Sequence, residues 1–111
     1  MFERERIGTI DVIHGVDALV TEHLEPFVEL LDECADEGQP KAVLDLRDVP
    51  LIDSAGLETL LDMQEKFEGY GGALKLLISN GLCKDILDVT GVDSHFEVFA
   101  DVREAVGSFA E

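Results

Sequence analysis

The stretch VPLIDSAGLETLL, residues 49–61, holds the transition that decides how this chain folds. An apolar run ends in the tetrapeptide DSAG at positions 53–56, and the apolar spacing typical of a helix begins at Leu57. Asp and Ser are preferred at helix amino termini because their side chains accept hydrogen bonds from the first, unpaired backbone N–H groups. The stretch therefore predicts a strand-to-helix junction, with the tip of the helix around Ser54.

Strands and helices are expected to alternate on both sides of this junction. Strands are expected at residues 2–6, 7–13, 42–46, 74–78 and 95–99, and further helices at residues 22–37, 82–89 and 101–110. The resulting order, ββαβαβαβα, predicts an α/β fold with a largely parallel sheet. Residues 46–53 should then lie at one rim of that sheet, and binding sites in such folds collect at the carboxyl ends of the strands.

Pro26 constrains where the first helix begins, because a proline beyond the first helical turn clashes with a backbone carbonyl. If Thr21 were the N-cap, Pro26 would lie past that turn. The helix is therefore expected to begin nearer residues 22–25, or to have a kinked first turn. Cys34 falls on the apolar face of this helix, where a free thiol acts as a small hydrophobic side chain.

The last two helices carry simpler signals. In the third helix the apolar spacing predicts an inward face made of Leu82, Ile86 and Val89. In the last helix Asp101 is a good N-cap, and Glu104 completes a pattern like a capping box.

The composition limits the classes of partner. The chain has 111 residues, which predicts a single domain covering residues 1–111. It carries 25 acidic and 8 basic residues, for a net charge of −17. This balance argues against nucleic acid and against anionic membranes, which both attract clustered Lys and Arg. A basic protein partner fits the charge, although acidic excess also serves solubility alone.

Targeting and membrane signals point to the cytoplasm. The amino-terminal segment has charges but no apolar core of a signal peptide, and no apolar run approaches the length of a membrane span. Cys34 and Cys83 stand in no CxxC or zinc spacing, so no oxidising compartment is needed.

The sequence contains no pattern typical of a catalytic site or a metal site. The string IDSAG, residues 52–56, lacks the GxSxG elbow of a serine hydrolase. His14, His23 and His95 are scattered without metal-ligand spacing. The glycines of GYGG, residues 69–72, follow a helix and predict a turn. We therefore expect no enzyme activity, no catalytic residue, no cofactor and no metal site.

Two interpretations of the DSAG junction remain open on the residues alone. The first is structural: Asp53 or Ser54 caps the helix, and Gly56 allows close packing. The second is functional, because a helix amino terminus attracts anions and a serine hydroxyl there is a plausible target for a kinase. A phosphate on Ser54 would add a charge of about −1.5 to −2 beside Asp53 and would disturb a partner docked on this rim.

Four segments of the sequence resemble a known family. They are GVDALV (15–20), KAVLDLRDVPLIDSAGLETLL (41–61), GGALKLLIS (71–79) and DILDVTGVDSHFEVFADVREAV (85–106). Together they are similar to the STAS domain, the module of anti-sigma factor antagonists and of sulfate transporter tails. The resemblance extends from about Ile7 to Phe109. It implies a mixed sheet of four to five strands with four helices and a role in binding a protein partner.

The resemblance also implies a mechanism called partner switching. An unphosphorylated antagonist of this family binds a serine kinase that acts as an anti-sigma factor, and phosphorylation at the tip of the second helix ends the binding. The family motif is Asp-Ser-Ser/Thr-Gly-Leu, and its phosphoacceptor is usually the residue before the glycine. Here that residue is Ala55, which cannot accept phosphate.

Three interpretations of this departure are left. Ser54, one residue earlier, is the phosphoacceptor; or the protein binds its partner constitutively; or it belongs to another branch, such as small STAS subunits of lipid-transport complexes. In the segment at 14–20, Gly15 and Asp17 also stand one residue closer than is common in the family. That segment is expected beside the junction, so it bears on which partner is chosen.

The predicted partner-binding surface centres on the junction and continues along the second helix. Its residues are Asp53, Ser54, Ala55, Gly56, Leu57, Glu58 and Asp62, with Glu65 and the loop 14–17 as a rim. Gly56 is expected to let a partner approach the backbone closely. The expected partner is a kinase-type anti-sigma factor, and the oligomeric state is left open.

Overall fold

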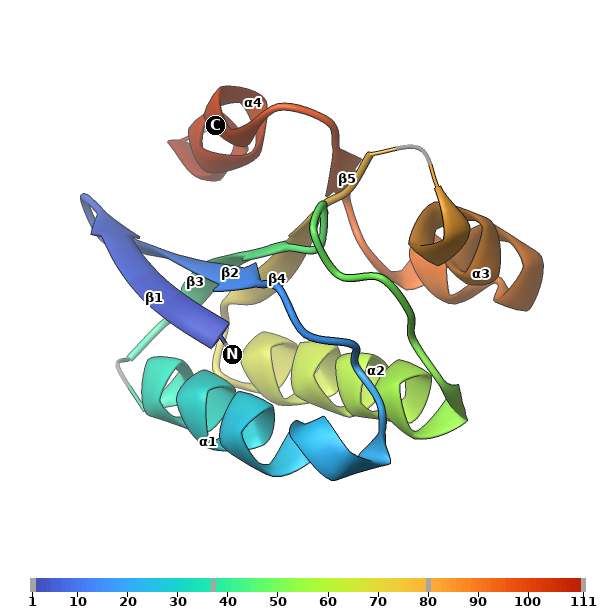
Figure 1. The fold of residues 1–111 in the computed structure, drawn as a ribbon. Coiled ribbons are helices and arrows are strands. Elements are labelled where there is room, and N and C mark those ends of the chain that lie inside the picture. Colours follow the sequence, from blue (N-terminus) through green and yellow to red (C-terminus); the bar gives the residue numbers. More distant parts are fainter. Residues whose placement is uncertain (1, 37, 80, 111) are drawn as a thin grey trace.

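The computed structural model describes residues 2–36, 38–79 and 81–110 (Figure 1). Its elements, in order, are β1 (Phe2–Ile7), β2 (Ile10–Gly15), the 3₁₀ turn η1 (Thr21–His23), α1 (Leu24–Ala35), β3 (Lys41–Asp45), α2 (Ser54–Gly69), β4 (Ala73–Leu77), α3 (Leu82–Thr90), the 3₁₀ turn η2 (Val92–His95), β5 (Val98–Phe99), α4 (Val102–Gly107) and the 3₁₀ turn η3 (Ser108–Ala110). The predicted order ββαβαβαβα is confirmed, with 3₁₀ turns inserted between some elements.

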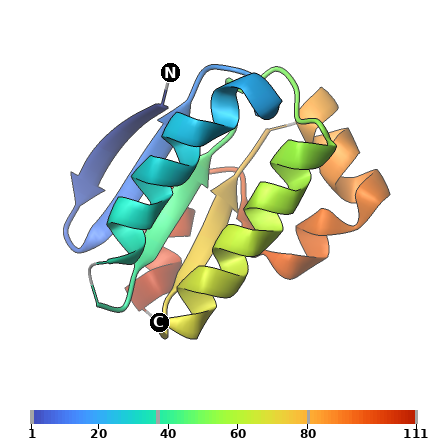
Figure 2. The same ribbon diagram turned by 90° about the horizontal axis from the view of Figure 1, so that it is seen from below.

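The five strands form one mixed sheet in the order β1-β2-β3-β4-β5. β1 pairs with β2 in antiparallel fashion, and the remaining neighbours are parallel. Helices α1 and α2 cover one face of the sheet, α4 covers the other, and α3 lies beyond the side of β4 and β5 (Figures 1 and 2). This arrangement is the α/β fold that the sequence predicts.

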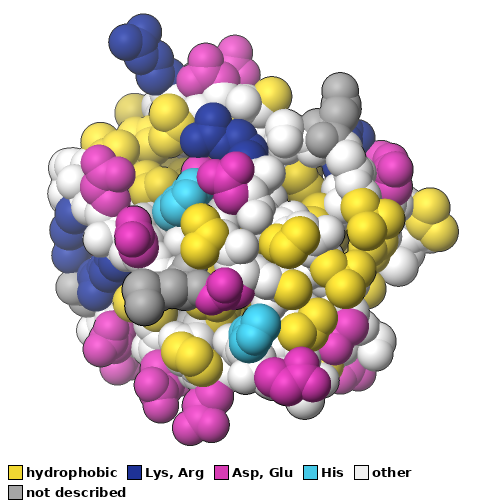
Figure 3. All heavy atoms as spheres, in the orientation of Figure 1, with side chains coloured by type: hydrophobic (Ala, Val, Ile, Leu, Met, Phe, Trp, Pro, Cys, Tyr) yellow, Lys and Arg dark blue, Asp and Glu magenta, His cyan; other side chains and the backbone are white. Residues whose placement is uncertain are grey.

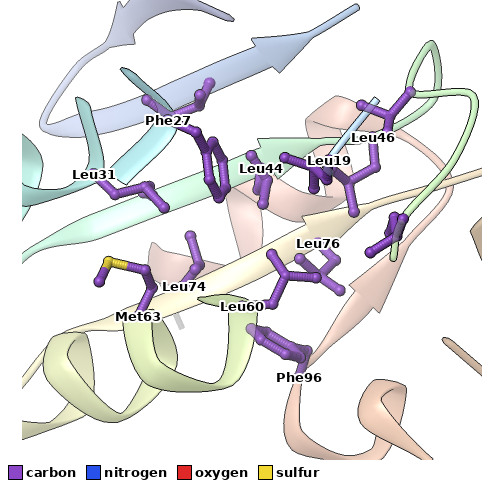
Figure 4. Packing of buried hydrophobic residues seen from close by; sticks show 14 of the residues in the cluster. Leu19, Phe27, Leu31, Leu44, Leu46, Leu60, Met63, Leu74, Leu76 and Phe96 are labelled. Carbon is purple, nitrogen blue, oxygen red and sulfur yellow. The ribbon is translucent and has the colours of Figure 1, made fainter. Parts of the chain in front are cut away.

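The central strands are buried on both faces, which explains their nearly continuous apolar sequences. Along β3, Ala42 and Leu44 point into the larger core under α1 and α2, whereas Val43 points into the smaller core under α4. Figure 4 shows Leu44 close to Phe27 of α1, with Leu60 of α2 nearby. The two cores hold the helices at fixed positions around the strand ends.

The turn between the first two strands differs from the prediction. β2 begins at Ile10 and not at residue 7, because Gly8 and Thr9 form the turn. Gly8 has a φ of 64°, a left-handed conformation that glycine adopts without steric cost. Residues 10–13 are all buried, so the alternation that would have located the strand is missing from the sequence.

The first helix begins where Pro26 requires. The 3₁₀ turn at Thr21–His23 precedes α1, and Pro26 is the third residue of the α-helix. The first N–H groups of a helix have no intrahelical acceptor, so the missing N–H of proline costs nothing at this position. The expected start near residues 22–25 is confirmed. The predicted end at residue 37 lies outside the described residues, and α1 ends at Ala35.

The inward face predicted for the third helix is wrong. The buried residues of α3 are Cys83 and Leu87, whereas Leu82 is 56% exposed and Val89 is 87% exposed. The Cys83 thiol donates a hydrogen bond to the Val49 carbonyl, 2.9 Å away, and together with the burial of Leu87 this bond favours the observed orientation of the helix. Both sets of residues recur with a helical period, so periodicity alone does not identify which set points inward.

The last helix has the predicted cap. The Asp101 carboxylate accepts a hydrogen bond from the Arg103 N–H at 2.7 Å. The regular helix ends at Gly107, and residues 108–110 continue as a 3₁₀ turn. On the sheet beneath it, the Lys75 ammonium donates to Ser108 at 2.7 Å and lies 4.2 Å from the centre of the Phe109 ring. The buried lysine therefore holds α4 and the turn that follows it against the sheet.

Gly72 and Gly69 provide a matched test of the close approach between the turn that follows α2 and the segment that precedes β3. A Cβ on Gly72 would overlap the carbonyl oxygen of Pro40, whereas a Cβ on Gly69 would have no neighbour within 4 Å. We expect Gly72→Ala to lower the free energy of unfolding by about 1–3 kcal/mol through overpacking. Gly69→Ala, in the last turn of a helix, should leave stability unchanged or raise it by up to about 1 kcal/mol. Urea denaturation of both variants measures the difference, and equal stabilities would contradict the close approach.

Candidate functional site

The junction between β3 and α2 is held by the segment that follows β2. Leu19 and Ile52 form an isolated parallel bridge. The Leu19 N–H donates to the Leu51 carbonyl at 2.8 Å, and the Asp53 N–H donates to the Leu19 carbonyl at 3.1 Å. The segment 14–20 therefore lies beside the junction, as the sequence predicts.

Asp53 caps α2 and also ties it to the start of the first helical segment. One carboxylate oxygen accepts the Gly56 N–H at 2.8 Å. The other accepts the backbone N–H of Thr21 at 3.2 Å and its hydroxyl at 3.4 Å. The hydrogen bond from Gly56, aided by those from Thr21, lowers the pKa of Asp53 below its usual value. The cap is thus Asp53, and Ser54 is the first helical residue.

Gly56 allows close packing within the chain, which is the structural interpretation that the sequence offered for it. It is buried, and a Cβ there would overlap the Leu19 carbonyl oxygen and lie 2.9 Å from the Ile52 side chain. The close approach predicted for a partner is therefore made by the chain's own backbone. Gly56 is buried in the free chain, and its contact with a partner stays a prediction.

The exposed side of the junction is a polar face of α2. Ser54, Glu58, Asp62 and Glu65 are exposed and recur at intervals of four, four and three residues, so they share one side of the helix. Two further predicted residues, Ala55 and Leu57, are half-buried at its edge. The predicted residues of α2 other than Gly56 therefore lie on or beside one face, which is dominated by carboxylates, whereas Gly15 of the predicted rim is buried.

The sequence does not identify Leu51, an exposed apolar residue next to this face. Leu51 is 41% exposed and immediately precedes the bridge residue Ile52. Val16, which is 49% exposed, occupies the neighbouring segment. Leu51 stands in a short apolar run that indicates burial, so no local pattern distinguishes it from its buried neighbours, whereas Val16 belongs to the loop 14–17 already expected at the rim.

Charged side chains connect the carboxyl ends of β2 and β3, from which the segment 14–20 and the junction follow. Asp45, at the end of β3, accepts two side-chain hydrogen bonds from Arg47 at 3.0 Å and lies 2.9 Å from the His14 ring at the end of β2. The other ring nitrogen of His14 lies 3.2 Å from Asp48. Burial alone would raise the pKa of Asp45, but the hydrogen bonds from Arg47 and His14 outweigh it and hold the pKa below its usual value.

The described part of the chain has no grouping of metal ligands and no helix suited to crossing a membrane. Within residues 2–36, 38–79 and 81–110, no three His, Cys, Asp or Glu side chains are grouped so that they could hold a metal ion. No helix in those ranges combines the length and the apolar character needed to span a bilayer. Cys34 and Cys83 are buried free thiols, and burial raises the pKa of Cys83.

Two substitutions at Asp53 separate its charge from its capping role. Asp53→Ala removes the acceptor for Gly56 and Thr21, so the melting temperature should fall at neutral pH. Asp53→Asn keeps a capping acceptor and should lose less. The pKa of Asp53 is lowered by folding, so its charge stabilises the protein above about pH 4, and that contribution disappears as pH falls through the lowered pKa.

Thermal unfolding from pH 7 to pH 2 measures both effects. The difference between the native protein and Asp53→Asn should shrink towards zero at acid pH. A difference that stays constant over this range would mean that the charge of Asp53 does not stabilise the junction.

Comparisons with known proteins place the chain in a family. The family model of the STAS domain matches residues 2–105. An anti-sigma factor antagonist from Mycobacterium paratuberculosis aligns with a TM-score of 0.89 at 17% identity, over 100% of this chain and 94% of the other. The phosphorylated form of the Bacillus cell fate determinant SpoIIAA aligns with a TM-score of 0.74 at 17% identity, over 98% and 99%.

The fold also occurs within a much larger protein. The murine anion transporter Slc26a9 aligns with a TM-score of 0.78 at 18% identity, over 92% of this chain but only 18% of the transporter. No curated protein sequence is detectably similar to this chain. The structural likenesses show a shared fold, and the family match over nearly the whole length shows more: this chain belongs to the STAS domain family.

Proposed function

We propose that this chain is a non-catalytic regulatory module, one domain acting in the cytoplasm, that binds a protein through the tip of α2. The observation that carries the proposal is the exposed face of Ser54, Glu58 and Asp62 at the rim of the sheet. Asp53 and the neighbouring segment fix the position of this face, so a partner meets a preformed surface. Such a surface suits recognition better than chemistry, because it offers neither a nucleophile paired with a base nor a metal cluster among the described residues.

The proposed partner is a kinase-type anti-sigma factor, which the resemblance in sequence implies, and the likeness in fold to an anti-sigma factor antagonist supports an anti-sigma factor as partner. The chain's net charge of −17 favours a partner with a basic docking surface and speeds their encounter. Residues Glu58 and Asp62 would then meet Lys or Arg side chains at the edge of the interface. Leu51, exposed beside them, would supply apolar contact area.

Ser54 is the candidate phosphoacceptor in this scheme. Its side chain is exposed at the first position of α2, whereas Ala55, at the usual family position, has no hydroxyl. Asp53 already provides the cap, so the Ser54 hydroxyl is not required for helix stability. A phosphate there would add a bulky, strongly hydrated anion at the centre of the surface and would disturb a closely packed partner.

The second candidate function is that of an accessory subunit bound permanently to an ABC transport complex for lipids or other substrates. Ala55 favours it, because a permanent subunit needs no phosphorylation switch. The occurrence of the fold within an anion transporter is compatible with it. Neighbouring genes discriminate the two: a kinase-type anti-sigma factor or a phosphatase supports switching, and a permease with an ATPase supports transport.

Incubation with the cognate kinase and ATP tests the phosphoacceptor. We expect phosphate on Ser54 or on no residue, because the usual acceptor position is Ala55. Mass spectrometry locates the phosphate, and Ser54→Ala should abolish any that is found. Phosphate mapped to another residue, such as the half-buried Thr59, would contradict the proposed site.

An enlarged side chain at the tip tests the surface itself. Ala55→Glu should weaken binding of the anti-sigma factor about tenfold, because it places a bulky carboxylate within a closely packed contact. Gln39→Glu adds the same charge at an exposed position before β3, away from the tip, and should leave affinity unchanged. Isothermal titration calorimetry measures both, and circular dichroism checks that both variants fold. Equal affinity of Ala55→Glu and the native protein would move the interface elsewhere.

A further inference from the structure

The outward face of α3 is an apolar stripe. Val89 is 87% exposed, Leu82 is 56% exposed, and Ile86 between them is partly exposed. The three residues recur at intervals of four and three, so they lie on one side of the helix. Figure 3 shows hydrophobic side chains gathered on the side of the molecule that carries α3.

This stripe has no role in the core of its own chain. Cys83 and Leu87 already fill the inward side of α3, and both belong to the main core. Rotating the helix to bury the stripe instead would expose Leu87 and break the hydrogen bond from Cys83 to the Val49 carbonyl. Apolar residues with this spacing are the means by which one amphipathic helix packs against another.

The charged residues beside the stripe indicate the charge expected of a helix that binds there. Asp85 is exposed, and the 3.6-residue repeat of a helix places it about 40° around the axis from Val89. Next to it is Asp88, and Lys84 forms an ion pair with Asp88 at 3.0 Å. The flank of the stripe therefore has an excess of negative charge. A second copy of this chain would bring the same acidic flank and a further charge of −17 to the contact.

We propose that the outward face of α3 binds a basic amphipathic helix of another protein, whose apolar residues cover Leu82 and Val89 and whose Lys or Arg residues meet Asp85. The stripe is separate from the face of α2 that carries Ser54. The end of the stripe at Leu82 lies near the loop before the junction, because Leu82 and Cys83 line a small pocket together with Val49 and Pro50.

Two designed peptides test the proposal on the native protein. Each is about 18 residues long and helical, with Leu at helical spacing, and one carries Lys on its flanks where the other carries Glu. We expect the Lys peptide to bind and the Glu peptide not to bind. In ¹H–¹⁵N spectra of the labelled protein, the Lys peptide should shift the amide signals of α3 most strongly. Shifts centred on α1 or on the polar face of α2 would overturn the assignment.

The variants Val89→Asp and Tyr70→Asp separate apolar contact from charge. Both add one carboxylate at an exposed apolar residue near the carboxyl end of a helix. Val89→Asp should weaken binding of the Lys peptide about tenfold, because an apolar contact is lost. Tyr70→Asp should leave binding unchanged or slightly tighter. If charge alone held the peptide, Val89→Asp would bind it at least as tightly as the native protein, and the proposal would fail.

The alternative is that a second copy of the chain covers the stripe, and sedimentation velocity detects such a dimer. A dimer that Val89→Asp dissociates and Tyr70→Asp does not would assign the stripe to self-association and overturn the proposal. A monomer at all concentrations, together with binding of the Lys peptide, is the expected result. Thermal unfolding of both variants should show only small losses of stability, because both replaced side chains are exposed and each new carboxylate lies at the negative end of a helix.

Discussion

The contact between the Leu19 carbonyl and the start of α2 is the constraint on which the candidate site depends. That carbonyl accepts the Asp53 N–H and occupies the space where a side chain at position 56 would lie. Asp53 then reaches back to Thr21 while it caps the helix. The helix tip and the neighbouring segment are therefore a single unit, and neither can move without breaking bonds made by the other.

This constraint separates the structural residues of the DSAG motif from the residues left for function. Asp53 and Gly56 are required by the chain's own geometry, the first as a cap and the second as the space for a carbonyl. Ser54 makes no contribution to the cap, and its side chain is exposed. The fold thus leaves two of the four positions, Ser54 and Ala55, free to be recognised, and of these only Ser54 carries a hydroxyl that can be modified.

The sequence predicted the elements of this fold better than their orientations. The order of strands and helices, the late start of α1 and the Asp101 cap follow from local signals: apolar runs, a proline and a capping residue. The orientation of α3 depends instead on the burial of Leu87 and on a hydrogen bond from Cys83 to a residue 34 positions away. The reason for Gly56 likewise lies in a segment distant in sequence. Local patterns do not encode such contacts, so the inward face predicted for α3 was wrong, and close packing at Gly56 was only one of two interpretations that the sequence offered.

The two proposed surfaces differ in how they would respond to salt. Attraction between the acidic face of α2 and a basic partner is screened over about 8–10 Å at physiological ionic strength, so its contribution falls as salt rises. Contact with the stripe on α3 removes apolar surface from water, and salt does not screen this effect. A partner that uses both surfaces would therefore be steered by the first and retained by the second. The strong negative charge of the chain then affects mainly the rate of association, and the exposed leucine and valine of α3 affect mainly the lifetime of the complex.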